Sequence, residues 1–393
     1  MVLFKMKDNL KILVFEAASA GLLKNFDLSI LSEGLTMLSI FAKDLVKAGC
    51  KVSIIIDKNL SSYLRFKAKI FKVENLNLSF LKRLAKSHDF TYVIAPETNN
   101  MLLKILEELE GFHLNSELEA VKQVSNKLNL INVLKSKGLK TPKVFTQENI
   151  EDLSFPLIAK PCLSAGCEGL KIIKNLKEFK KNLRTIKNDS FIQEFVRGVP
   201  ASVSLVSNGF KAKALTLNRQ FIKLNNAEYL GGFTPLNHKL KLQALKTAEK
   251  AVEAFKGLKG YIGVDLMLLK NEPCIIEVNP RLTVSYAGLS KASTINLTNL
   301  IINSSLGKTI DAKLSFKTSC FFRKTLFKNL TKKFIYETTY LKEFLTPTII
   351  NPKKNNEGCS FIAVMANNIF EAEKKYLSLI KKLSNKVKAV YEW

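Results

Sequence analysis

The chain has 393 residues, of which 47% are hydrophobic and 24% are charged, a balance typical of two or three globular domains and not of a disordered chain. Its net charge of +27 is compatible with binding to nucleic acid, but only seven of the 61 basic residues are arginines and no long basic run occurs. The composition therefore favours lysines that are spread over solvated faces rather than a nucleic-acid-binding surface. A basic nucleic-acid-binding protein remains the alternative function.

The first hundred residues alternate between apolar strands and amphipathic helices. Strands are predicted at residues 10–15, 51–57 and 91–95, and helices at 32–48 and 99–109. This alternation predicts a doubly wound α/β domain up to about residue 113. Ligands of such sheets bind beyond the carboxyl ends of the strands, so Glu16, Ser19, Ser32 and Glu33 are candidate substrate contacts. Helix capping is an equally good explanation for Ser32 and Glu33.

A lysine and a loop of small residues follow a helix predicted over residues 115–137. Lys160 lies near the end of a predicted strand at 155–161, and the loop 164–169 (SAGCEG) leads into another strand at 170–173. Small residues allow backbone N–H groups to approach anionic oxygens, and the lysine adds a compact positive charge. The pattern predicts a phosphate-binding loop, with a plain hairpin turn as the alternative.

Further strands are predicted at residues 190–196, 201–206 and 211–219, before a turn at 228–235 and a helix at 240–255. The paired glycines of that turn would suit a loop that lies against a small ligand.

Residues 260–286 (GYIGVDLMLLKNEPCIIEVNPRLTVSY) predict a β-hairpin with strands at 262–269 and 274–279. A loop with an odd number of residues would place Asp265 opposite Glu277, and would gather Ile262, Val264, Leu266, Leu268, Cys274, Ile276 and Val278 on one apolar face. Asn279 then shares the polar face with the two carboxylates. Three hard oxygen donors predict a Mg²⁺ site, and Arg281 just beyond the strand could hold a phosphate or a carboxylate. The alternative is a hairpin with a solvated polar mouth.

The remaining chain predicts a helix at 294–306, a strand at 315–322, an irregular lysine-rich region with a flexible loop at 351–357, a strand at 359–365 and a helix at 369–387.

Gly-Val-Asp265 followed by Glu277-Val-Asn-Pro-Arg281 resembles the magnesium-binding end of the ATP-grasp family. The resemblance implies an α/β (α+β ATP-grasp) fold. An N-terminal doubly wound pre-ATP-grasp domain (1–113) would precede a two-lobed ATP-grasp domain (114–308) with a hinge near 194–197. Strands and a helix at 309–393 would pack on the ATP-grasp domain.

The resemblance also implies roles for individual residues. Asp265, Glu277 and Asn279 would bind the metal, and Arg281, Lys160 and Arg219 would be catalytic. The implied ATP contacts are Lys127, Lys160, Ser164, Ala165, Gly166, Gly169, Gln193, Glu194, Phe195 and Val196, with the backbone of 194–196 pairing with adenine.

The implied activity is an ADP-producing carboxylate–amine ligation through an acyl phosphate, with ATP and Mg²⁺ (or Mn²⁺) as cofactors. Residues 279–289 (NPRLTVSYAGL), Glu33-Gly34 and Ala95-Pro-Glu-Thr98 resemble the archaeal tyramine–L-glutamate ligases of methanofuran biosynthesis. L-Glutamate and tyramine are therefore the expected substrates, and an ATP-grasp ligase with another amino acid and amine is the alternative.

Six cysteines without CxxC pairs and three dispersed histidines give no zinc pattern. Free cysteines, no long apolar run and no signal-peptide pattern predict a cytoplasmic protein without a membrane partner. A homo-oligomer is compatible with the sequence.

Overall fold

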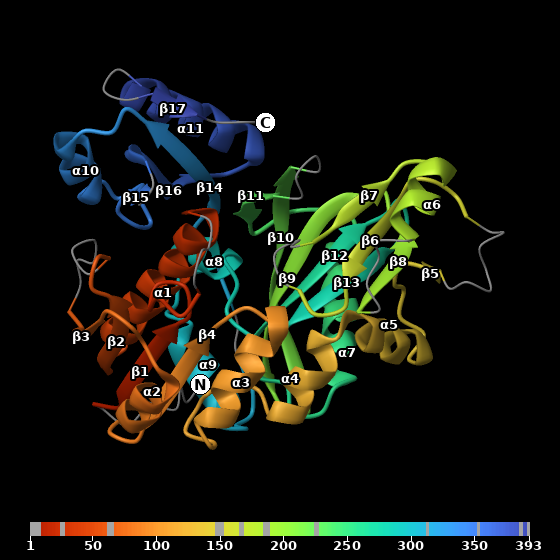
Figure 1. Ribbon diagram of the computed structural model, residues 1–393, viewed down its shortest axis with the longest axis horizontal. Coiled ribbons are helices and arrows are strands. Elements are labelled where there is room, and N and C mark those ends of the chain that lie inside the picture. The colour runs from red at the N-terminus through yellow and green to blue at the C-terminus, as the bar shows by residue number, and fades with distance from the viewer. Residues whose placement is uncertain are drawn as a thin grey trace.

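The N-terminal part of the computed structural model is a parallel sheet with helices on both faces (Figure 1). The structure describes residues 9–23, 28–60, 67–145, 153–164, 169–183, 189–223, 228–311, 314–351, 354–384 and 388–390. The sheet has the order β3-β2-β1-β4, with strands β1 Lys11–Glu16, β2 Lys51–Asp57, β3 Lys69–Val73 and β4 Phe90–Ile94. Helix α1 (Leu28–Lys47) covers one face, and α2 (Leu78–Ala85) and α3 (Met101–Glu108) cover the other.

The apolar strands explain this sandwich. In β1, Ile12 and Val14 pack in the core with α1, whereas Leu13 and Phe15 pack in the core with α2 and α3. A strand that is apolar on both faces is typical of a covered parallel sheet. The doubly wound prediction is confirmed, although α1 begins four residues earlier than predicted and β3 and α2 were not predicted. β3 is a partly exposed edge strand and lacks the continuous apolar run of its neighbours.

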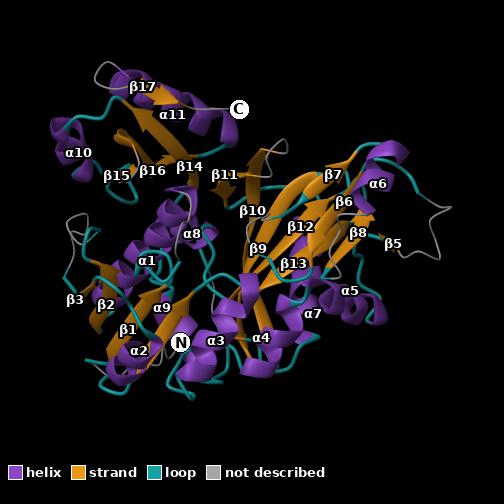
Figure 2. Cartoon of the chain, viewed as in Figure 1, coloured by secondary structure: helices purple, strands orange, loops and turns teal. Residues whose placement is uncertain are grey.

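A large antiparallel sheet crosses the rest of the molecule (Figure 2). Its order is β13-β12-β9-β10-β11-β14-β16-β15, with β17 paired to β14. The strands are β9 Val199–Asn208, β10 Ala212–Lys223, β11 Glu228–Thr234, β12 Lys259–Leu268, β13 Pro273–Asn279, β14 Ser319–Lys328, β15 Ile349–Asn351, β16 Lys354–Ala366 and β17 Lys388–Val390. The C-terminal strands thus extend the same sheet.

A small antiparallel sheet, β5-β8-β6-β7, lies over the β12–β13 end of the large sheet (Figure 1). Its strands are β5 Val144–Phe145, β6 Leu157–Pro161, β7 Lys171–Ile173 and β8 Ser190–Glu194. The remaining helices are α4 Leu118–Ser125, α5 Lys127–Ser136, α6 Leu176–Leu183, α7 Lys241–Glu253, α8 Ser285–Ala292, α9 Thr298–Ser305, α10 Lys332–Thr339 and α11 Ile369–Ser384.

Two predicted turns are strands in the structure. The stretch 228–235 is mostly β11, and a Cβ at Gly231 would lie 2.1 Å from the Phe322 carbonyl oxygen of β14. The paired glycines therefore admit a neighbouring strand at close range. The predicted flexible loop 351–357 was also wrong, because residues 354–357 begin β16. α8 and α10 were not predicted.

The single helix predicted over 115–137 is divided into α4 and α5 at Asn126. Asn126 has extended backbone angles, and its side chain accepts hydrogen bonds from the N–H groups of Leu128 and Asn129. This is an N-cap, which starts a new helix at Lys127. The break directs Lys127 toward the two sheets.

Gly34 on α1 makes room for the buried carboxylate of Glu16, which accepts hydrogen bonds from the N–H groups of Ala18 (3.0 Å) and Ser19 (2.7 Å). A Cβ at Gly34 would lie 2.5 Å from that carboxylate. We expect Gly34→Ala to lower the free energy of unfolding by about 1–2 kcal/mol, because overpacking outweighs the helix propensity of alanine. Denaturant titration in a double-mutant cycle with Glu16→Ala checks this. A destabilisation that persists undiminished in the Glu16→Ala background would contradict it.

Candidate active site

The β12–β13 hairpin brings the two predicted carboxylates face to face. Asp265 pairs with Glu277 and Gly263 pairs with Asn279, as predicted. The route differs from the prediction, because Leu268 pairs with Pro273 across a four-residue loop, and the register shifts by one residue between Asp265 and Leu266. A β-bulge at Ile276 absorbs the extra residue, so Ile275 rather than Ile276 packs in the core. The even loop and the bulge together give the pairing that an odd loop would have given.

Alternation along β9, β10 and β12 separates a polar face from a buried apolar face. Asp265 pairs with Ser202, which in turn pairs with Asn218, so these side chains share the face of the carboxylates. On the other face Val203, Leu217 and Val264 are fully buried. The polar face is thus a hydrogen-bonded floor, in which Asn218 donates to Ser202 (3.2 Å) and Ser204 (3.0 Å).

Arg219 lies on the opposite face from the carboxylates, since it pairs with the core residue Ala201. Its guanidinium donates to the carbonyl oxygen of Pro200 at 3.1 Å and lies over the ring of Phe221. Gln220, the next residue, is the β10 side chain that reaches the site, where its amide donates to Asp265 at 2.8 Å. The catalytic prediction for Arg219 is therefore not supported by its position, and Gln220 was missed.

The carboxylates of Asp265 and Glu277 are close together and poorly solvated. Burial, followed by the negative charge of Glu277, raises the pKa of Asp265 from 3.8 to about 7. Asn279 donates to Asp265 at 3.1 Å, so its nitrogen, rather than the predicted oxygen, faces the carboxylate. A cation placed between the side chains would favour the flipped amide with its oxygen inward.

Lys127 connects the carboxylate pair to the small sheet. Its ammonium lies 3.3 Å from Glu277 and donates to the backbone oxygen of Ser164, in the loop that follows β6. The lysine is 4% exposed. The structure thus brings Lys127, Ser164 and Glu277 together, as the site prediction requires.

Lys160 and Gln193 share one face of the small sheet, because Lys160 pairs with Phe191 two residues away from Gln193 on β8. The other face packs on α6 through Leu157, Ala159 and Ile192. Gln193 is 2% exposed, and its oxygen Oε1 accepts no hydrogen bond within the described part of the chain. Leaving a buried acceptor without a hydrogen bond costs free energy. The Gln193 oxygen therefore suits a hydrogen-bond donor on a ligand, such as an exocyclic amine.

The predicted hinge at 194–197 and the predicted phosphate-binding loop at 164–169 offer fewer contacts to a nucleotide than predicted. Backbone N–H groups of Glu194 and Phe195 donate to Lys143 and Pro156, so adenine would rely on the amide of Val196 and on the carbonyl groups. Gly169, with φ of +72°, lies in the turn just before β7, against Pro161. Ala165 and Gly166 lie outside the described residues.

Arg281 makes a bidentate ion pair with Glu97, in the turn after β4. Nε and one terminal nitrogen of Arg281 each lie 3.0 Å from a Glu97 oxygen, and Glu97 is 2% exposed. Burial alone would lower the pKa of Arg281, but the carboxylates of Glu97, Glu277 and Asp265 raise it. The N-terminal sheet therefore fixes the arginine beside the carboxylate pair, a contact that sequence reasoning missed.

A second charged cluster joins α1, β11 and β14. Lys324 lies 3.5 Å from Glu33 and 2.8 Å from Glu228, with its side chain 2% exposed. Burial alone would lower the pKa of Lys324, but the two carboxylates raise it; burial raises the pKa of Glu33. Lys324 and Glu228 were not predicted, and nothing distinguishes Lys324 in sequence from the other lysines. Glu16 and Ser32, in contrast, are occupied by local hydrogen bonds.

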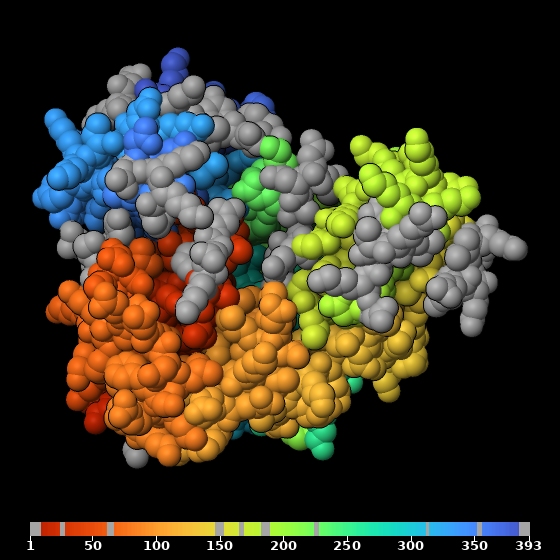
Figure 3. Space-filling model, in the orientation of Figure 1, coloured from red at the N-terminus to blue at the C-terminus, as the bar shows by residue number. Residues whose placement is uncertain are grey.

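The residues present fit a divalent cation and a nucleotide. Asp265 and Glu277 are partly buried, and burial and then the repulsion from Glu277 raise the pKa of Asp265. Both carboxylates would gain from a cation, and their oxygens are the donors that Mg²⁺ prefers. The buried Lys160 and the unsatisfied Gln193 oxygen lie on the adjoining small sheet, and the buried Lys127 lies at the start of α5. In Figure 3 the small sheet forms a lobe that stands out from the rest of the surface, with the central strands set back beside it.

The chain combines a parallel sheet, a hairpin that carries two carboxylates and a small sheet that carries a lysine. This combination is typical of an α/β enzyme that binds nucleotide phosphates. A model described as an ATP-grasp domain matches residues 124–285, and one described as a pre ATP-grasp 3 domain matches residues 50–121. The chain belongs to the ATP-grasp family and is an ATP-grasp ligase, which binds ATP.

Tyramine–L-glutamate ligases are among its relatives. The enzyme of Methanocaldococcus jannaschii is 32% identical over 286 residues, which are 71% of this chain and 84% of that protein. The enzyme of Methanocaldococcus fervens is 31% identical over 315 residues, which are 78% and 98%. A crystal structure of an L-amino acid ligase from Bacillus licheniformis has a TM-score of 0.68 at 16% identity, covering 99% of this chain and all of that chain, and so shares the fold.

Within the described residues, no helix combines the length and the apolar character that crossing a bilayer requires.

Proposed function

We propose that the protein is a carboxylate–amine ligase that joins L-glutamate to tyramine. Two tyramine–L-glutamate ligases are similar over most of their length. The observation that carries the proposal is a convergence: the three stretches that resemble those enzymes lie around one site. Arg281 is bound to Glu97, and Glu33 reaches the cluster of Lys324 beside the same N-terminal sheet.

The charges around this site suit an amino acid and an amine. Glu33 and Glu228 both lie beside the ammonium of Lys324, which shows that their carboxylates suit an ammonium group. The raised pKa of Glu33 suits it to accept a proton from the ammonium of the substrate and release the free amine. Arg281 and Lys324 offer donors for the carboxylates of glutamate.

The proposed reaction transfers the terminal phosphoryl group of ATP to a glutamate carboxylate. The amine nitrogen then attacks the acyl phosphate, phosphate leaves, and the products are an amide, ADP and phosphate. Mg²⁺, when bound to Asp265, Glu277 and the Asn279 oxygen, would neutralise phosphate charge. Lys160 and Lys127 would hold the phosphates, and Arg281 would offset charge as the phosphoryl group moves. The Gln193 oxygen would accept the adenine amine.

The test is ADP release by the purified chain with Mg-ATP and L-glutamate, with and without tyramine. We expect release that depends on tyramine, with amide product equal to the ADP formed. Equal ADP release without tyramine would contradict the proposed substrate pair. If the protein turned over another amine or amino acid but not this pair, the proposed substrates would be wrong and the ligase chemistry would stand.

A further inference from the structure

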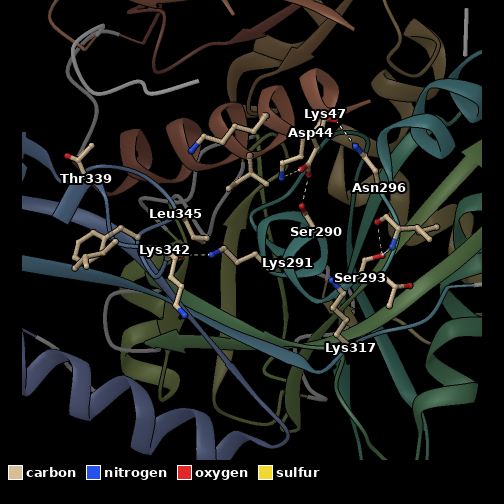
Figure 4. A pocket seen from close by; sticks show the side chains of 16 residues that line it. Asp44, Lys47, Ser290, Lys291, Ser293, Asn296, Lys317, Thr339, Lys342 and Leu345 are labelled. Carbon is tan, nitrogen blue, oxygen red and sulfur yellow. Dashed lines mark hydrogen bonds and ion pairs between the residues drawn. The ribbon is translucent and has the colours of Figure 1, made fainter. Parts of the chain in front are cut away.

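A large cavity lies away from the proposed reaction site, between α1, α8 and the segment that follows α10. Its volume is about 630 Å³, within the range of small-molecule sites. Its ionisable lining consists of five lysines and one aspartate: Lys43, Lys47, Lys291, Lys317, Lys342 and Asp44. Figure 4 labels all of these except Lys43, and shows the labelled groups, contributed by α1, α8 and the C-terminal part of the chain, around one space.

The carboxylate of the aspartate already bonds to groups of the protein itself. Asp44 accepts hydrogen bonds from the hydroxyl groups of Tyr286 (3.0 Å) and Ser290, and pairs with Lys47 at 3.4 Å. The ammonium of Lys291 donates to the backbone oxygen of Lys342, a neutral acceptor that does not cancel its charge. The lining therefore holds a clear excess of positive charge.

Lys43 and Lys291 are partly buried, which makes their positive charges costly. Burial, followed by the neighbouring charges of Lys291 and Lys47, lowers the pKa of Lys43. Burial likewise lowers the pKa of Lys291, where Lys47 and Lys342 act in the same direction and Glu343 opposes them. Lysines on an open, solvated face do not acquire such shifts, so the cavity differs from the lysine-rich surface elsewhere.

We propose that this cavity binds a small anion that carries several phosphate groups. Flexible lysines act as point charges toward phosphate oxygens, whereas planar carboxylates are matched best by the arginine fork. Among the residues that the structure describes, no arginine lines the cavity. The volume fits a ligand of nucleotide or oligophosphate size. None of the described residues that are proposed to bind ATP or the metal lines the cavity, so we place it apart from the ligase reaction.

The experiment is calorimetric titration with inorganic tripolyphosphate in metal-free buffer, where the probe is not chelated. The Lys43→Gln/Lys291→Gln variant is compared with wild type and with Lys104→Gln/Lys122→Gln, which removes the same charge from exposed positions on α3 and α4. We expect the cavity variant to lose roughly tenfold or more in affinity, because two charge-assisted contacts are removed. The control should bind like wild type, and both variants should keep the wild-type ADP affinity. The control should keep the wild-type Tm, and the cavity variant should match or exceed it, because two charges that repel each other are removed.

Three results would overturn the proposal: no tripolyphosphate binding to wild type, unchanged affinity in the cavity variant, or an equal loss in both variants. Citrate and a single-stranded oligonucleotide serve as further probes. Weaker binding of both than of tripolyphosphate supports a phosphate site. Tighter citrate binding would make it a carboxylate site, and tighter oligonucleotide binding with the same dependence on Lys43 and Lys291 would make it part of a nucleic-acid surface.

Discussion

Asp265→Asn is expected to abolish turnover while stabilising the metal-free protein. Loss of one carboxylate from the proposed metal site should lower kcat by roughly 10³-fold or more, since metal coordination contributes several kcal/mol of charge stabilisation. The same change removes a buried charge that Glu277 repels, so the free energy of unfolding should rise by about 1–3 kcal/mol at pH 8. Gln220 can rotate its amide to offer an oxygen to the new NH₂ group.

The stability gain should depend on pH in one direction. The folded pKa of Asp265, about 7, is above its ordinary value of 3.8, so between these values the folded state holds a proton that the unfolded state has lost. Wild type therefore loses stability as the pH rises through this window, and the advantage of the variant grows from about pH 4 and levels off above pH 7.

Urea titrations of the metal-free proteins at several pH values and a steady-state ADP assay measure both effects. Glu107→Gln, which removes a carboxylate exposed on α3, should change neither. A variant that retains wild-type kcat, or a stability difference that shrinks as the pH rises, would contradict the account.

Arg281→Lys is expected to lower both activity and stability. Lysine cannot reproduce the bidentate pair with Glu97, whose carboxylate is 2% exposed. We expect a loss of about 2 kcal/mol in the free energy of unfolding and a fall in kcat of roughly 10²–10³-fold, because a positioned charge near the reacting phosphoryl group is lost.

Glu97→Gln separates positioning from catalysis. It retains the guanidinium but loosens its orientation, so kcat should fall less than in Arg281→Lys. Arg83→Lys, at an exposed position on α2, is the matched control and should behave as wild type in both the kinetic assay and chemical denaturation. If Arg281→Lys kept the wild-type kcat, the proposed catalytic role of Arg281 would be contradicted.

The sequence predicted the parts of the site that depend on local patterns. Alternation in β12 and β13 was enough to pair Asp265 with Glu277, because a misaligned hairpin would have buried polar groups on both faces. The bulge at Ile276 could not be read from the sequence, since an even loop with a bulge and an odd loop give the same pairing. The alternation of Ser202-Val-Ser204 and Asn218-Arg-Gln220 was available and would have favoured Gln220 over Arg219.

Contacts between distant segments could not be predicted. Glu97 and Arg281 are separated by 184 positions, and their pairing depends on how the N-terminal sheet docks. Lys324 reaches Glu33 only because β14 extends the large sheet past β11 and over α1. β11 was mistaken for a turn because its paired glycines serve close strand packing, which has the same composition as a loop.

The central claim is that the β12–β13 hairpin binds a divalent cation beside the phosphates of ATP. The most direct measurement is a crystal structure with Mn²⁺ and ADP, in which anomalous scattering locates the metal. The account predicts an anomalous peak within coordination distance of Asp265, Glu277 and the Asn279 oxygen, next to the ADP phosphates and Lys160. A metal–nucleotide complex bound elsewhere, with these three side chains uncoordinated, would contradict it.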